Sequence, residues 1–302
     1  MKRLNARQRD TLDGYLFTML PVLGVIIFVG LPLIVSLFLS FSHLDSFDLF
    51  EAKFVGLDNY IKIFTSDKKF LGAIGSSFLY AIATSLLQTA LALVLAYFLS
   101  KQIKLAKVFR IILFIPYVCS VAVLSIVWKW LLDGNFGILN DILIKLGGEP
   151  IDWLKNPNTS MLMMIIMSVW SGLGYGTILY TAALSSVNKA IYEASMMDGA
   201  NGFQRFFRIT LPQISNTTFY LLVMGMIGNL QAFANFQIMK PLGPNGQIET
   251  LVYRVWFTAF EADFTTYGIG YSSALGWLSG LIIILFTIIM FRMQKKWVHY
   301  ES

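Results

Sequence analysis

Six long apolar stretches constrain the fold of this 302-residue chain more than any other feature. A helix needs about 20 mostly apolar residues to cross the hydrocarbon core of a bilayer. Stretches of that length lie near residues 15–39, 74–99, 109–132, 161–184, 214–239 and 271–293. Only 13% of the residues are charged, about half the share found in an average soluble domain. The pattern predicts an all-α integral membrane protein with six transmembrane helices.

Basic residues are distributed unevenly over the segments that flank these stretches. The two ends of the chain and the segments 100–110 and 185–213 hold 14 Lys and Arg residues and five acidic residues, a net charge of +9. The remaining segments hold nine basic and 12 acidic residues, a net charge of −3. Because basic segments stay on the cytoplasmic side, we expect both termini and the 185–213 segment in the cytosol. This bias accounts for the net charge of +6 without a nucleic acid partner.

The segments on the other side of the membrane are 40–73, 133–160 and 240–270, and they contain turn signals such as Asp133-Gly134-Asn135. None of them is long enough for a separate extracellular domain. We therefore predict a single transmembrane domain over residues 1–302.

The sequence lacks the histidine clusters and the phosphate-binding motif that would indicate a metal site or an ATPase. Cys119 is the only cysteine, and the only histidines, His43 and His299, fall on opposite sides of the predicted membrane. No Gly-Lys pair occurs, which excludes the phosphate-binding loop of an ATPase. We expect no catalytic residue, no metal ion, no cofactor and no enzymatic activity.

The longest predicted cytoplasmic segment, 185–213, has the pattern of a helix, a bend and a second helix. Residues 190–197 favour a short helix, and Glu193 is expected near its start, where the helix dipole favours a carboxylate. Gly199 and Gly202 interrupt that helix. Pro212 suits the first turn of the fifth span. The segment is therefore expected to form a compact knob in the cytosol.

This segment resembles the EAA loop of binding-protein-dependent ABC importer permeases. The family pattern is Glu-Ala-Ala, three residues, Gly, nine residues, Ile, one residue and Leu-Pro. This chain has Glu193-Ala194-Ser195, Gly199, Ile209 and Leu211-Pro212 at the same spacing, with serine in place of the second alanine. The resemblance implies that these residues, together with Asp198, contact a cytosolic ATPase subunit.

The resemblance covers most of the chain, because segments 54–60, 136–140, 170–174 and 242–244 are similar to the sugar-importer, maltose-permease-like branch. It implies one of two dissimilar permease subunits in a bacterial cell membrane. The implied partners are two copies of an ABC ATPase subunit and an extracytoplasmic binding protein that delivers a sugar or oligosaccharide. The Gly-Gly-Gly-Pro run usual in that branch is Pro241-Leu242-Gly243-Pro244 here. Another organic solute, such as a glycerol phosphate or a peptide-like compound, is the alternative substrate.

Polar and aromatic residues inside the spans are the candidates for a substrate path. Gln231 and Asn235 would share one face of an unbroken fifth helix, with Asn229 about 160° away from Gln231. Trp170 and Tyr175 in the fourth span are candidates for stacking on sugar rings. Hydrogen bonds between helices and membrane anchoring are the alternative roles of these residues, and Gly172, Gly174 and Gly176 are expected to allow close helix approach.

Two other functions compete with the permease hypothesis: a membrane enzyme acting on lipid-linked substrates, and a self-sufficient secondary carrier. A proton- or sodium-coupled carrier often needs a charged residue inside the membrane. No acidic or basic residue lies deep in the six stretches, and the nearest is Lys129.

Overall fold

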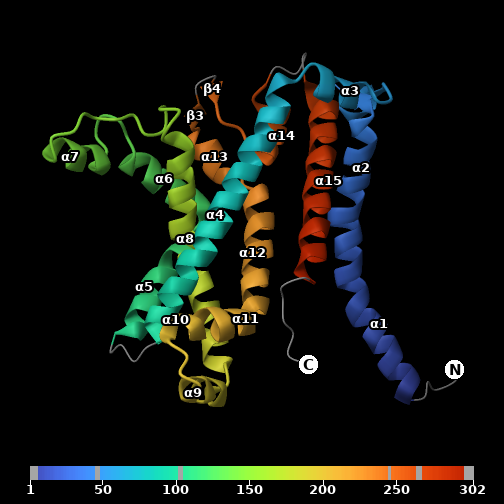
Figure 1. Cartoon of the computed structure of the whole chain (residues 1–302). Helices are drawn as coiled ribbons and strands as arrows, with labels where there is room; N and C mark the ends of the chain where they lie inside the picture. The colour runs from blue at the N-terminus through green and yellow to red at the C-terminus, as the bar shows by residue number, and fades with distance from the viewer. Residues whose placement is uncertain (1–5, 45–47, 101–104, 244–245, 263–266, 296–302) are drawn as a thin grey trace. The chain divides into compact units, whose positions relative to one another are not determined.

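The computed structural model describes residues 6–44, 48–100, 105–243, 246–262 and 267–295, and this part of the chain is mostly helical (Figure 1). The ends of the chain, Lys101, Lys104 and Pro244 lie outside the described residues. Contacts divide the chain into two compact units, 1–67 with 255–278 and 68–254 with 279–302. The expectation of one domain over residues 1–302 stays a prediction.

The first unit begins with a long helical segment and continues into a short hairpin and a helix. This helical segment consists of α1 (Ala6–Val25), a π-helical turn (Ile26–Gly30) and α2 (Leu31–Ser40). Strands β1 (Ser42–His43) and β2 (Lys53–Phe54) pair antiparallel around a 3-10 turn (Leu49–Glu51), and α3 (Asp58–Thr65) follows. Buried Asn59 joins these parts, because its amide donates to the carbonyl oxygens of Ser40 at 3.0 Å and Ser42 at 2.9 Å.

The second unit is built around the helices α4 (Lys68–Ser100) and α8 (Ser160–Ser186), which pack side by side (Figure 1). The other elements that lie wholly within this unit are α5 (Ala106–Val118), α6 (Val121–Leu131), α7 (Ile138–Lys145), α9 (Lys189–Met197), α10 (Gly202–Arg205), a π-helical turn (Phe206–Thr210), α11 (Leu211–Gln213), α12 (Ser215–Leu230), α13 (Ala234–Met239), β3 (Leu242–Gly243) and β4 (Gly246–Gln247). Helices α14 (Leu251–Phe260) and α15 (Gly268–Gln294) contribute residues to both units.

Glycines of α8 allow its neighbours to approach closely, as the sequence predicted. A Cβ atom on Gly176 would lie 2.8 Å from the Cβ of Ala92 on α4. One on Gly174 would lie 2.2 Å from the carbonyl oxygen of Leu113 on α5. Protein interiors are packed densely, so larger residues at these positions would push α4 and α5 away from α8.

Four of the predicted spans match helices that are long and apolar enough to cross a bilayer: Asp13–Ser40, Lys68–Ser100, Ser160–Ser186 and Gly268–Gln294. The third span was predicted as one helix over 109–132, and this was wrong. It is a pair of helices, α5 and α6, bent by 99° at Cys119 and Ser120. Pro116 removes one backbone donor in the last turn of α5, which weakens the helix just before the bend.

The fifth span was also predicted as one helix, over 214–239, and it is interrupted too. Helix α12 ends at Leu230, residues 231–233 are not helical, and α13 begins at Ala234. No proline or glycine lies at this break. Contacts with distant residues stabilise it instead, since the Thr250 hydroxyl donates to the Ala232 carbonyl at 2.7 Å.

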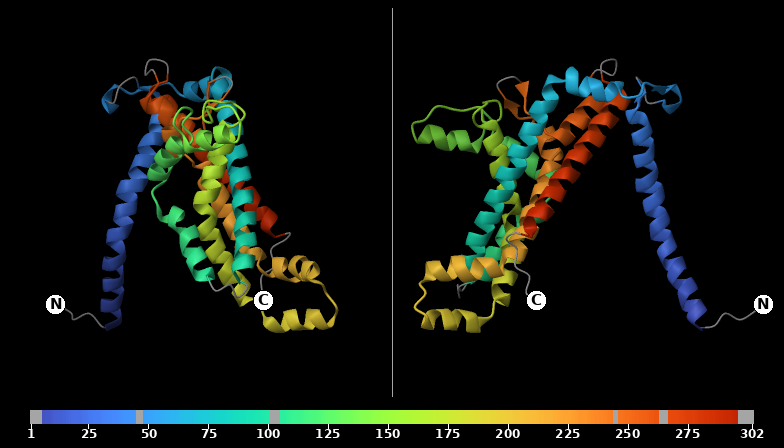
Figure 2. Two further views of the ribbon diagram at one scale, coloured as in Figure 1. Left: turned by 90° about the vertical axis from the view of Figure 1, so that its left-hand side faces the viewer. Right: turned by 45° about the vertical axis from the view of Figure 1, so that its right-hand side comes forward.

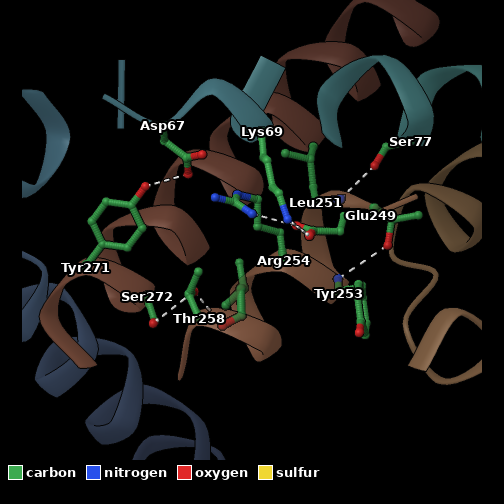
Figure 3. A network of polar contacts seen from close by, with 12 residues as sticks. Asp67, Lys69, Ser77, Glu249, Leu251, Tyr253, Arg254, Thr258, Tyr271 and Ser272 are labelled. Atoms are coloured by element: carbon green, nitrogen blue, oxygen red, sulfur yellow. Dashed lines mark hydrogen bonds and ion pairs between the residues drawn. The ribbon is translucent and has the colours of Figure 1, made fainter. Parts of the chain in front are cut away.

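The segments predicted as loops at 133–160 and 240–270 contain the helices α7 and α14, which the sequence analysis missed. In the second unit, the buried carboxylate of Glu249 accepts from Arg254 at 2.6 Å and from Lys69 at 3.3 Å (Figure 3). The Ser77 hydroxyl of α4 accepts from the Leu251 amide at 2.8 Å. These contacts attach the start of α14 to α4.

Candidate functional site

Two interrupted helices frame a cavity of about 660 Å³ in the second unit. Pro116, Tyr117 and Cys119 line it at the bend between α5 and α6, and residues 231–235 line it at the break between α12 and α13. Helices α4 and α8 supply the remaining walls. Irregular backbone at membrane depth is tolerated where it lines a cavity, and transporters commonly place binding sites at such discontinuous helices.

The break after Leu230 changes how the polar residues of the fifth span are placed. Asn229, Gln231 and Asn235 all line the one cavity. Asn229 was expected about 160° away from Gln231 around the helix, and both residues nevertheless line this cavity. The predicted helical face shared by Gln231 and Asn235 was wrong, because α12 ends at Leu230 and α13 begins only at Ala234.

These three side chains have different surroundings. Asn235 is buried, and its amide donates to the Tyr80 hydroxyl at 2.8 Å. Asn229 donates to the Ser85 hydroxyl at 3.0 Å. The Gln231 side chain is exposed and forms no hydrogen bond within the described part of the chain, so its amide is available to a ligand.

Aromatic side chains form one wall of the cavity. The rings of Tyr117 and Tyr175 stack with their centroids 4.8 Å apart, and the Tyr175 and Tyr220 hydroxyls are 3.0 Å apart. Tyr117 and Tyr220 were missed by the sequence analysis. Trp170 is not among the lining residues, and its ring centroid lies 5.8 Å from that of Trp128.

Gln88 of α4 adds another side-chain amide to the lining. A Cβ atom on Gly172 would lie 1.7 Å from Gln88 Nε2, so that glycine leaves room for the amide. Among the described residues that line the cavity, none is charged. Lys129 lies outside the lining and donates to the carbonyl oxygen of Ile238 in α13 at 3.0 Å.

The predicted helix-bend-helix segment is present as α9 followed by α10, a π-helical turn and α11 (Figure 2). The Asn188 side chain caps α9 by accepting from the Ala190 amide at 2.9 Å. Asn201 and Gln204 form a reciprocal capping box at the start of α10. Both helices therefore have defined N-terminal ends.

Gly199 makes the bend, as predicted, with a φ of 77°. The amide of Ala200 donates to the Ser195 carbonyl at 3.0 Å and that of Gly199 to the Met196 carbonyl at 3.1 Å. This pair of bonds is the Schellman ending of a helix, which requires the left-handed conformation at the residue after the cap. Gly202 makes no such bend and lies in α10 instead.

The predicted contact residues occupy different positions on this segment. Glu193, Ala194 and Asp198 are exposed, whereas Ser195 is buried and its hydroxyl donates to the Tyr192 carbonyl at 2.7 Å. Glu193 is the fifth residue of α9 and lies beyond its first turn, so its predicted place near the helix start was wrong.

The second half of the motif anchors the segment. Ile209, Leu211 and Pro212 are half-buried, and Leu211 packs against a buried cluster that includes Tyr180 and Ile214. Pro212 lies in α11, and α12 begins only at Ser215. The Tyr192 and Thr210 hydroxyls, 2.8 Å apart, attach α9 to this anchored part.

An uncharged cavity framed by interrupted apolar helices defines a membrane protein of the solute-permease class. Residues 88–298 match the family described as "Binding-protein-dependent transport system inner membrane component". The chain belongs to this family and is an ABC transporter permease, a transport component of the inner membrane rather than an enzyme.

Curated relatives match over nearly the whole chain. The probable ABC transporter permease protein YesP of Bacillus subtilis is 35% identical over all of this chain and 96% of its own length. The arabinooligosaccharides transport system permease protein AraP of the same species is 30% identical, covering 93% of this chain and 88% of its own. The sn-glycerol-3-phosphate permease protein UgpA of Agrobacterium fabrum is 30% identical, with coverage of 95% and 96%.

The fold is that of solved ABC transporters. A chain in the crystal structure of a bacterial alginate ABC transporter, in complex with a periplasmic protein that holds an alginate pentasaccharide, matches with a TM-score of 0.81 and 20% identity. That match covers 98% of both chains.

Proposed function

We propose that this chain forms half of the translocation path of an ATP-driven importer for a neutral sugar or oligosaccharide. The uncharged cavity is the observation that carries this proposal. Amides such as those of Gln88 and Gln231 suit the hydroxyl groups of a sugar, because each amide both donates and accepts hydrogen bonds. The stacked rings of Tyr117 and Tyr175 offer an apolar face to a sugar ring.

A phosphorylated solute is the second candidate, because the UgpA proteins among the relatives are named for sn-glycerol-3-phosphate. Phosphate is usually bound by Arg, Lys or backbone amides at a helix N-terminus. The described lining residues include no Arg or Lys, so one of these two kinds of phosphate ligand is absent, and this favours the neutral sugar.

In this proposal the membrane domain has six spans. The bent pair α5 and α6 counts as one span, and α12 with α13 as another. Helix α12 alone has 16 residues, about 24 Å, which is shorter than the hydrocarbon core of about 30 Å. Both termini lie in the cytosol, as the charge bias indicates.

The segment from α9 to α11 is proposed as the EAA coupling loop that contacts the ATPase. Met197 and Phe203 on this segment are exposed, as a docking surface requires, and the Gly199 bend gives α9 a fixed end. The proposed partners are a second, dissimilar permease subunit, two ATPase subunits and an extracytoplasmic binding protein.

Replacing the free amide of the cavity tests the substrate path. Gln231→Leu should lower uptake of a neutral oligosaccharide by roughly three- to tenfold, the loss of one hydrogen bond of about 1 kcal/mol, while the complex still assembles. Gln237→Leu is the matched control, since Gln237 lies in α13 outside the lining. Equal uptake by both variants and the parent would place the path elsewhere.

A further inference from the structure

Thr250 lies outside the cavity lining and is fully buried, yet it contacts the break that frames the cavity. Its hydroxyl donates to the Ala232 carbonyl at 2.7 Å. Carbonyl groups lose their helical donor where a helix is interrupted, and residues 231–233 are not helical. A carbonyl that is removed from water needs another donor, and the Thr250 hydroxyl supplies it.

The same hydroxyl also accepts a hydrogen bond from its own helix. Thr250 directly precedes α14, and its Oγ1 accepts from the Tyr253 amide at 3.3 Å, which is the bond of a helix N-cap. The Thr250 carbonyl accepts from the Arg254 amide at 2.8 Å. Because one lone pair of the hydroxyl oxygen faces α14, its hydrogen is left for the Ala232 carbonyl.

Neighbouring contacts hold Thr250 in place. On one side, Glu249 forms a buried ion pair with Arg254 at 2.6 Å (Figure 3). On the other side, the Leu251 amide donates to the Ser77 hydroxyl of α4 at 2.8 Å. The start of α14 is therefore a fixed point of the second unit, and the Thr250 hydroxyl joins the break to it.

The carbonyl that Thr250 holds is next in the chain to a residue of the cavity. Gln231 lines the cavity, and its backbone amide donates to the Ile227 carbonyl at the end of α12, at 3.3 Å. The position of its side chain thus depends on two backbone supports, α12 before it and Ala232 after it. Loss of the Thr250 hydroxyl would release the second support.

We propose that Thr250 is a positioning residue of the substrate path. Its hydroxyl holds the backbone at 231–233 and thereby sets where the Gln231 amide meets the solute. Thr250 itself does not reach the solute, because it lies outside the lining. The hold on the backbone depends only on contacts within the second unit, whereas its effect on transport rests on the proposed function.

Thr177 of α8 provides a matched control. Like Thr250 it is fully buried and lies outside the lining, and its hydroxyl donates to the Leu173 carbonyl at the same distance of 2.7 Å. That carbonyl lies inside an unbroken helix and keeps its backbone donor. Thr177→Val therefore removes an equivalent hydrogen bond without releasing a break.

Three substitutions at Thr250 are compared with this control. Thr250→Val keeps the size of the side chain and removes the hydroxyl. Thr250→Ala removes the hydroxyl without placing a methyl group against the Ala232 carbonyl, so it carries the same comparison if the valine variant assembles poorly. Thr250→Ser keeps the hydroxyl.

The first measurement follows the backbone and needs no solute. Hydrogen exchange of residues 231–237 in the detergent-solubilised complex should rise by roughly three- to tenfold in Thr250→Val and Thr250→Ala, as expected for one lost hydrogen bond. Thr250→Ser and Thr177→Val should exchange like the parent. A rise confined to the start of α14 would overturn the proposal, because the hydroxyl would then only cap its own helix.

The second measurement is a double-mutant cycle on uptake, with radiolabelled neutral trisaccharides as probes. Thr250→Val should lower uptake by roughly three- to tenfold in the parent but by less than about twofold in Gln231→Leu, where the amide to be positioned is already absent. Thr250→Ser should keep parental uptake. Equal losses in both backgrounds would overturn the proposal, since they would indicate a general structural role.

The two measurements separate this proposal from the proposed function. If Gln231→Leu alone leaves uptake unchanged while exchange depends on Thr250 as expected, the hold on the break is supported and the substrate role of Gln231 is wrong. If exchange of residues 231–237 is the same in Thr250→Val, Thr250→Ala and the parent, Thr250 is not a positioning residue, whatever Gln231→Leu does to uptake.

Discussion

At the residue scale, Gly199 differs from the nearby Gly202 in one respect that can be tested. A Cβ atom at either position would meet nothing within 4 Å, but only Gly199 has a positive φ, at 77°. A β-branched residue at Gly199 must therefore adopt a strained backbone, at a cost of roughly 1–3 kcal/mol, or shift the end of α9.

Gly199→Val is expected to weaken retention of the ATPase and to abolish uptake, while Gly202→Val keeps both. Glu193→Ala should reduce uptake only partly, because an exposed ion pair contributes about 1 kcal/mol or less. Co-purification of the ATPase with each variant, followed by uptake assays, measures these effects. If Gly199→Val behaves like Gly202→Val, the segment is not the coupling element.

At the element scale, a single amide organises the segment around α7. Asn140 forms five hydrogen bonds with backbone and indole groups of this segment. The helix ends at Lys145, and Gly147, which follows the C-cap residue Leu146, has a φ of 85°. At the other end, backbone amides of Phe136 and Asn135 donate to the Asp133 carboxylate and hold its pKa below its usual value.

Asn140→Asp should destabilise this segment by about 1–3 kcal/mol, because it removes two donors and places a carboxylate against two carbonyl oxygens. Hydrogen exchange of residues 133–160 in the detergent-solubilised complex measures the effect. Asn135→Asp makes the same chemical change at an exposed neighbouring position and should leave exchange unchanged. Similar exchange in both variants would contradict the role given to Asn140.

Some helices and bends follow from local sequence, whereas others depend on distant contacts. Long apolar runs predicted α4 and α8, and the glycine signal predicted the bend at Gly199, since these features depend on local chemistry. The break at 231–233 depends on Thr250 and Tyr80, which are distant in sequence. Helical periodicity carries no information about such partners, so the placement of Gln231 and Asn235 on either side of a break could not be predicted. The signal for α7 was present in its apolar spacing and in Gly147, but it was not used.

At the scale of the whole molecule, the charge distribution predicts the orientation. The net charge of +9 on one set of segments and −3 on the other predicts a cytosolic 185–213 segment. Reporter fusions near Asn201 and after Ser302 should be active as cytosolic reporters, and one near Gly148 as an external reporter. An external result at Asn201 would reverse the orientation and remove the proposed contact with the ATPase.

The two helix breaks have a consequence for how such a permease diversifies. The Ala232 carbonyl at the break is bonded by Thr250, a residue outside the cavity lining. The exposed Gln231 side chain has no part in holding the break open. In the proposed substrate path, mutation at such a position would therefore change the preferred solute without rebuilding the scaffold. A lineage of transporters can in this way acquire new nutrients by drift at a few tolerant positions while its architecture stays constant.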